Sequence, residues 1–154
     1  MSDGEAPAVV TKSMVIARDV AAVFRIWTEQ VHLWWPAGHS RSGDPYTKVI
    51  IEGRVGGRFY ERTSNGDEYE WGRILIWEPP HRLVYTWYLG SSQELPTEVD
   101  VRFVPLNPQQ THLELEHRGV ELIGDLWWQR VKIFNDSWDK ILMTFQVHGG
   151  SHMV

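Results

Sequence analysis

The sequence predicts an α+β fold in which a curved antiparallel sheet grips one long C-terminal helix. From Gly124 to about His148, large apolar residues recur at steps of three and four, which places them on one stripe of a helix. Between Thr47 and His117 the apolar residues alternate with a period of two, as strands do. A lone helix cannot bury such a stripe, so the sheet is expected to receive it. The stripe consists of Trp127, Val131, Phe134, Trp138, Ile141 and Phe145.

The composition indicates one ordinary globular domain. The chain has 154 residues, of which 42% are apolar and 23% are charged. Its nine tryptophans are unusual and predict a core or cavity walled by large rings. A net charge of -5 argues against a nucleic-acid partner. No apolar run approaches the ~20 residues of a membrane span and no signal peptide is recognisable, so we expect no membrane partner and a cytoplasmic location.

The first third of the chain predicts one strand and two helices. Residues 1–8 are expected to be a flexible lead, and 9–16 have strand composition. Asp19 is placed to cap a helix, and Thr28 to cap a second short helix that ends at Pro36. Residues 37–46 are then expected to form a loop.

The middle of the chain predicts about six antiparallel strands. Asn65-Gly66 between two strand-like runs is a strong hairpin signal. Residues 90–96 and 107–110 are expected to be loops. The expected strands are 48–52, 58–63, 68–77, 83–87, 99–103 and 111–117.

The domain is expected to end with the long helix, shortly before the end of the sequence. Gly149-Gly150 predicts the stop of the long helix, so the domain is taken as 9–148 and the tail as 149–154. The final Gly-Ser-His-Met-Val resembles a remnant of cloning and carries no fold expectation.

Several motifs carry a resemblance to a known family. They are Leu-Trp-Trp-Pro at 33–36, Gly-Gly-Arg-Phe at 56–59, Trp-Gly-Arg-Ile at 71–74, Pro-Pro-His-Arg-Leu-Val-Tyr-Thr-Trp at 79–87 and Thr-His-Leu-Glu-Leu-Glu-His-Arg-Gly at 111–119. The chain resembles the START-like (SRPBCC) superfamily and, within it, bacterial proteins similar to the activator of the heat-shock protein 90 ATPase. The resemblance implies a helix-grip fold with an apolar cavity between sheet and last helix. Relatives bind lipids, hormones or polyketides, cyclise polyketides, or stimulate a chaperone.

A cavity is expected between the sheet and the last helix. We predict that it is bounded by Trp35, Phe59, Tyr85, Trp87, His117 and that helix. Segment 34–39 predicts either a lid over the cavity mouth or core packing with one exposed ring. His117 predicts either a hydrogen-bonded core histidine or a polar anchor for a ligand. The candidate ligand-binding residues are Trp35, His39, Phe59, Glu61, Glu70, Tyr85, Trp87, His117, Trp127, Phe134 and Trp138.

The Asn-Gly hairpin predicts a pair of facing carboxylates. A two-residue loop would place Glu61 opposite Glu70 and Tyr60 opposite Trp71. The glutamates are assigned to the inner face, and Tyr60 and Trp71 to a solvated face with arginines. Two close carboxylates would share a proton, so one pKa should be raised. Solvated surface charges are the alternative.

Other chemistry finds little support in the sequence. The seven histidines show no metal-ligand spacing, the chain has no cysteine, and no phosphate loop or nucleophile elbow is present. We therefore expect no metal and no cofactor.

These patterns favour a protein that binds an apolar or aromatic small molecule. One alternative is a cyclase- or hydrolase-like enzyme that uses cavity carboxylates and His117. Another is a chaperone-ATPase-activating interaction module with a chaperone partner. A homodimer is left open.

Overall fold

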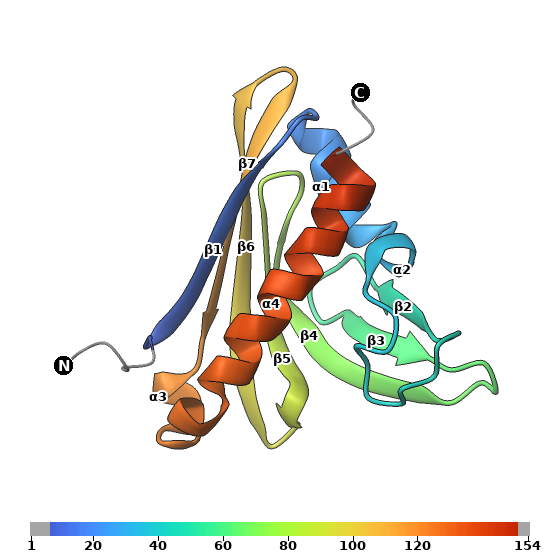
Figure 1. Ribbon diagram of the computed structural model, residues 1–154, viewed down its shortest axis with the longest axis vertical. Helices are drawn as coiled ribbons and strands as arrows, with labels where there is room; N and C mark the ends of the chain where they lie inside the picture. Colours follow the sequence, from blue (N-terminus) through green and yellow to red (C-terminus); the bar gives the residue numbers. More distant parts are fainter. Residues whose placement is uncertain (1–6, 151–154) are drawn as a thin grey trace.

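The computed structural model describes residues 7–150, which form one antiparallel sheet, a long helix and three short helices (Figure 1). The sheet has seven strands in the order β1-β7-β6-β5-β4-β3-β2. The strands are β1 (Val9–Ile16), β2 (Lys48–Ile51), β3 (Arg58–Arg62), β4 (Glu68–Glu78), β5 (Arg82–Ser92), β6 (Leu95–Asn107) and β7 (Gln110–Arg118). The helices are α1 (Val20–Thr28), α2 (Val31–Trp34), α3 (Val120–Ile123) and α4 (Leu126–Gly150). The predicted element order is confirmed, with α3 as an addition.

The curved sheet wraps around α4, as the apolar stripe predicted (Figure 1). All six residues of the stripe are at most 3% exposed. The rings of Trp27 and Trp34, from α1 and α2, lie 5.0 Å and 4.8 Å from the ring of Phe145. The two short helices therefore cover the C-terminal half of α4, and the helix-grip fold is confirmed.

One of the two predicted N-terminal helix caps is correct. The Asp19 carboxylate accepts a hydrogen bond from the backbone N–H of Ala22, which caps α1. The prediction for Thr28 was wrong, because Thr28 lies inside α1 and its hydroxyl donates to the carbonyl of Phe24 at 2.8 Å. This bond to the preceding turn competes with a capping role. Helix α2 instead follows Gln30.

The β3–β4 hairpin differs from the predicted register. Thr63 N–H donates to Asp67 O and Gly66 has a φ of 96°, so the loop holds three residues, with glycine at the left-handed position. Glu61 therefore pairs with Tyr69 and Tyr60 pairs with Glu70. The predicted Glu61–Glu70 facing pair was wrong.

A β-bulge at Trp71 then restores the register expected further along the hairpin. Phe59 pairs with Gly72 as predicted, and Trp71 is the extra residue. The bulge turns Trp71 to the inner face, where it is 1% exposed and stacks on Phe59. The solvated position predicted for Trp71 was wrong. Tyr60 is also buried, because the guanidinium of Arg58 covers its ring at 3.9 Å.

Three element boundaries also differ from expectation. The loop predicted at 90–96 is mostly strand, because β5 continues to Ser92 and β6 begins at Leu95. Gly124 ends α3 rather than starting the long helix. Helix α4 continues through both glycines, and Arg18 donates to the carbonyl of Gly149 at 2.9 Å. Most of the predicted lead and most of the Gly-Ser-His-Met-Val segment lie outside the described residues.

Candidate ligand-binding site

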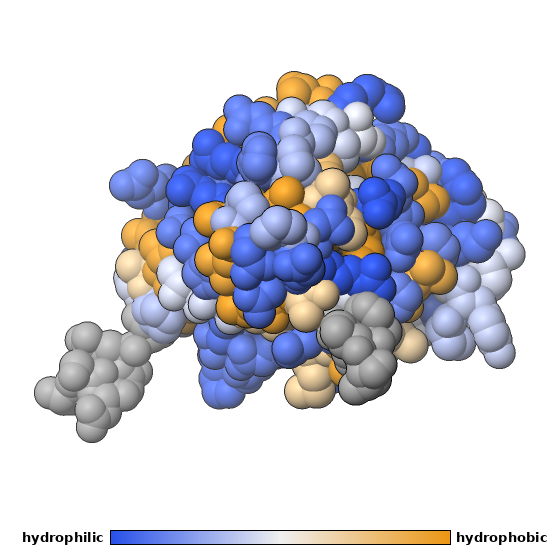
Figure 2. Space-filling view, turned by 90° about the horizontal axis from the view of Figure 1, so that it is seen from above, coloured by the Kyte–Doolittle hydropathy of each residue, from blue (hydrophilic) through white to orange (hydrophobic). Residues whose placement is uncertain are grey.

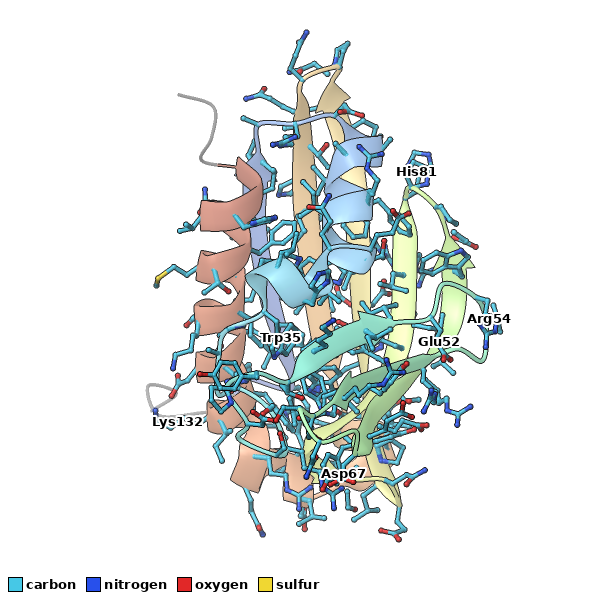
Figure 3. All side chains as sticks on the ribbon, turned by 90° about the vertical axis from the view of Figure 1, so that its right-hand side faces the viewer. Trp35, Glu52, Arg54, Asp67, His81 and Lys132 are labelled. Atoms are coloured by element: carbon cyan, nitrogen blue, oxygen red, sulfur yellow. The ribbon has the colours of Figure 1, made fainter. Side chains whose placement is uncertain are left out.

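The predicted cavity residues meet in the interior, where they form a continuous aromatic core. Phe59 lies 5.8 Å from Trp35 and 5.0 Å from Tyr85, measured between ring centroids. Trp87 lies 5.1 Å from Phe59 and 5.6 Å from Trp138. The cavity was therefore predicted too deep in the interior. Trp35, Phe59 and Tyr85 pack against one another and do not line the open space, which lies beside them. Figure 3 shows Trp35 between α4 and the β2–β4 end of the sheet.

The open space is a pocket between α4, β5 and the segment that follows α2. Its volume is about 210 Å³. Four of the predicted site residues line it, namely His39, Trp87, Phe134 and Trp138. We call it the aromatic pocket. Its full lining is Gly38, His39, Ser40, Trp87, Leu89, Ile133, Phe134, Ser137, Trp138 and Ile141.

His117 lies behind the pocket and connects its two tryptophans. Trp138 Nε1 donates to His117 Nδ1 at 2.9 Å, so the proton of the neutral ring is on Nε2, which lies 2.6 Å from the Thr97 hydroxyl. The Thr97 hydroxyl donates to the Trp87 carbonyl at 3.2 Å. His117 is fully buried, and burial, aided by the positive charge of Arg118, lowers its pKa to about 3. Of the two interpretations, the structure supports the hydrogen-bonded core histidine.

Trp127 and Phe134 pack around this histidine. The His117 ring lies 4.4 Å from the Phe134 ring and 5.5 Å from the Trp127 ring. Trp127 is fully buried, and its Nε1 donates to the carbonyl of Pro7 at 2.9 Å. Trp127 is therefore a core residue, whereas Phe134 reaches the pocket.

Glu61 anchors the loop that forms one wall of the pocket. Its buried carboxylate accepts hydrogen bonds from Arg41 N at 2.7 Å, Ser42 N at 3.3 Å, Ser42 Oγ at 2.6 Å, Thr47 Oγ1 at 2.9 Å and Trp71 Nε1 at 3.0 Å. Burial opposes ionisation of Glu61, but these hydrogen bonds outweigh it and lower its pKa. The carboxylate thus holds the loop in an ionised, fully hydrogen-bonded state.

Glu70 lies in a different environment from Glu61. Its two carboxylate oxygens accept hydrogen bonds from Arg73 and from the hydroxyl of Tyr88, each at 2.8 Å. Burial opposes ionisation, but these two donors lower the pKa of Glu70 below its usual value. The predicted carboxylate pair with one raised pKa was therefore wrong, because both pKa values are lowered by separate partners.

Segment 34–39 fits core packing better than a lid, but the one exposed ring that was expected is absent, because Trp34 and Trp35 are both buried. Trp34 is buried and donates to the carbonyl of Ile26 at 2.8 Å. Trp35 donates to the carbonyl of His39 at 2.7 Å, which fixes the turn after α2. His39 is half-buried in the pocket wall, and burial, together with the positive charge of Lys140, lowers its pKa. The tryptophans belong to the core, and the following residues form the wall.

Sequence reasoning missed several pocket residues. Ile133, Ser137 and Ile141 follow one another at steps of four on α4. Ile133 and Ser137 lie beside the apolar stripe, and Ile141 belongs to it. This row with a small polar residue at its centre was a usable signal. Leu89 was missed because its strand was expected to end earlier.

A second, polar hollow adjoins the aromatic pocket. Its volume is about 540 Å³, and it shares Ser40 and Leu89 with the aromatic pocket. Its other lining residues are Arg41, Glu70, Trp71, Tyr88, Ser92, Gln93 and Glu94.

Residues 7–150 show neither a metal-ligand cluster nor a helix that could span a membrane. Within that range, no group of three or more His, Asp or Glu side chains is arranged to hold a metal ion. None of the helices in the same range is long and apolar enough to cross a membrane.

The gripped helix and the pocket beside it define a START-like helix-grip protein, a fold that supports a ligand-binding cavity. The family model described as "Activator of Hsp90 ATPase homolog 1-like protein" matches residues 17–147, and the chain belongs to this family. No curated protein sequence matches it significantly.

Two solved structures illustrate the similarity. One is the anthrahydroquino-γ-pyrone synthase Txn09 complexed with SUM, with 32% identity and a TM-score of 0.61, over 91% of this chain and 98% of that one. The other is CalC, a self-sacrificing resistance protein from Micromonospora echinospora, with 27% identity and a TM-score of 0.71, over 93% of this chain and 96% of that one.

Proposed function

We propose that this protein binds an aromatic small molecule in the aromatic pocket. One observation carries the proposal: the rings of Trp87 and Trp138 line the pocket 5.6 Å apart and are joined from behind through His117 and Thr97. A platform held in this way loses little side-chain freedom when a ligand binds.

The lining combines aromatic rings with small polar groups, which suits an aromatic ligand. Trp87, Phe134 and Trp138 line the pocket although each is at most 3% exposed, so a ligand would contact only the small part of each ring that reaches the pocket. Ser40 and Ser137 add hydroxyl groups that can orient a polar substituent. The name of Txn09, which refers to the synthesis of an aromatic compound, is consistent with this ligand class.

Catalysis on such a ligand is a second candidate function, favoured by the similarity to a synthase. Its only support within the pocket is His39, whose lowered pKa keeps the imidazole neutral at pH 7 and able to accept a proton. The groups first considered for catalysis lie elsewhere: His117 is behind Trp138, Glu61 anchors the loop, and Glu70 faces the polar hollow.

The surface facing the viewer in Figure 2 gives little support to the interaction-module alternative. There, hydrophobic residues are interspersed among hydrophilic ones instead of forming one broad patch. A chaperone partner therefore remains an expectation from the family resemblance, and we do not propose it.

Filling the pocket tests the binding proposal. Ser137→Leu adds apolar volume to the pocket wall without altering the buried stripe. We expect a panel of bicyclic and tricyclic aromatic compounds to quench tryptophan emission and raise the melting temperature of the unmodified protein. Ser137→Leu should weaken binding at least tenfold. Gln129→Leu, at an exposed position on the same helix, is the matched control. If no compound binds the unmodified protein, the proposal fails.

A further inference from the structure

The aromatic pocket is small for a complete ligand site. Its volume of about 210 Å³ lies below the roughly 300–1,000 Å³ usual for such sites. The polar hollow shares Ser40 and Leu89 with it, and together the two spaces fall within that range. A ligand larger than the aromatic pocket would therefore extend past Ser40 into the polar hollow.

The charged side chains of the polar hollow differ in whether they have an ion-pair partner. Glu70 is neutralised by Arg73 and hydrogen-bonded by Tyr88. Arg41 has no ion-pair partner among residues 7–150, although it lines the same hollow. Glu94 is exposed in the turn between β5 and β6, where water and salt screen its charge.

Arg41 is held in place more firmly than an ordinary surface arginine. Its backbone N–H donates to the buried Glu61 carboxylate at 2.7 Å. Its guanidinium lies 5.1 Å from the centre of the Tyr69 ring, within the distance of a cation–π contact. Arg41 is exposed, so salt screens its charge as it screens that of Glu94. An arginine whose backbone is anchored and whose guanidinium contacts a ring still loses less freedom than a mobile one when it binds an anionic oxygen.

Ser40 supplies a second donor at the boundary of the two spaces. Its hydroxyl oxygen accepts a hydrogen bond from the backbone N–H of Gly43 at 2.9 Å. No described residue accepts its proton, so the hydroxyl can donate to a ligand. Arg41 and Ser40 are both donors, whereas the lining of the aromatic pocket is mainly apolar.

We infer that the ligand is an aromatic compound with an anionic oxygen group, such as a carboxylate or a phenolate, which binds Arg41 and Ser40 in the polar hollow. The aromatic part occupies the aromatic pocket, so this inference rests on the proposed function. Glu61 is a positioning residue, because it holds Arg41 and the pocket wall through the same carboxylate.

Matched carboxylates and amides test the inference. The probes are 2-naphthoate and 2-naphthylacetate, each compared with its primary amide by isothermal titration calorimetry at low ionic strength. We expect at least one of the two carboxylates to bind the unmodified protein roughly three- to tenfold more tightly than its own amide. This preference should shrink when salt is added, because exposed charges are screened.

Arginine variants separate charge from fold. Arg41→Gln should abolish the preference for the carboxylate and leave the affinity for the amide unchanged, whereas Arg41→Lys should keep part of the preference. Arg54→Gln is the control, because Arg54 is exposed and lies at the edge of the molecule away from α4 (Figure 3).

The outcomes distinguish the two proposals. If neither amides nor carboxylates bind, the aromatic-binding function itself fails. If amides and carboxylates bind the unmodified protein equally, the function stands and the anionic group is overturned. An equal loss of both affinities in Arg41→Gln would also overturn it, because the side chain would then act on the loop and not on the charge.

Discussion

Trp138 and His117 form a buried hydrogen bond in which the indole Nε1–H donates to the imidazole Nδ1 at 2.9 Å. This bond determines the tautomer of the histidine and fixes the orientation of a tryptophan that lines the aromatic pocket. It thus links the packing of the core to the shape of the site.

We expect His117→Phe to destabilise the protein by about 2–4 kcal/mol. Phenylalanine can fill much of the space, but it leaves the buried Nε1–H of Trp138 without an acceptor, and an unsatisfied buried group costs roughly 1–3 kcal/mol. Urea unfolding measures the loss. His81→Phe, at an exposed position, is the control and should change stability by less than about 0.5 kcal/mol. A similar small effect at His117 would contradict the proposed structural role.

The buried histidine should also make stability depend on pH. The pKa of His117 is about 3 in the folded protein and 6.5 when the histidine is unperturbed, so the unfolded chain binds the extra proton between these values. Stability is therefore complete above pH 6.5 and falls as the pH drops toward 3, by at most about 1.4 kcal/mol per pH unit from this group.

Comparing the unmodified protein with His117→Phe isolates this contribution. Between pH 6.5 and 5, before most carboxylates titrate, the stability of the unmodified protein should decline more steeply than that of the variant. Equal slopes would mean that His117 is not buried in its neutral form.

Glu61→Gln should loosen the loop more than it destabilises the whole fold. The glutamine amide group replaces an acceptor oxygen with a donor, so at least one of the five hydrogen bonds is lost, at about 1–3 kcal/mol. Hydrogen exchange at the amides of Arg41 and Ser42 should accelerate first. Glu78→Gln, at an exposed carboxylate in β4, should leave both amides unchanged. Unaltered protection in Glu61→Gln would show that the loop is held by other contacts.

Truncating Phe134 should test the grip on α4. Phe134→Ala removes a ring that is 3% exposed and packed on His117, so a loss of about 3–5 kcal/mol is expected. Ile133→Ala, next to it on the helix, removes a side chain that is 58% exposed and should cost less than about 1 kcal/mol. Denaturant unfolding compares the two, and similar losses would count against a gripped helix.

The sequence by itself determined the apolar stripe of α4, the succession of helices and strands along the chain, and the inward position of His117. These features follow from periods of three to four or of two, which are local properties of a helix or a strand and survive in any packing.

Tertiary structure decided where each hairpin residue faces. A three-residue loop moved Glu61 away from Glu70, and the bulge at Trp71 let its indole reach Glu61. Periodicity cannot reveal either feature. The turn is closed by Thr63 and Asp67 and is tied to Asp44 through Ser64, and the bulged Trp71 donates to Glu61. The pocket is likewise a tertiary feature, because its position depends on how much of the space between sheet and helix the large rings of the core fill.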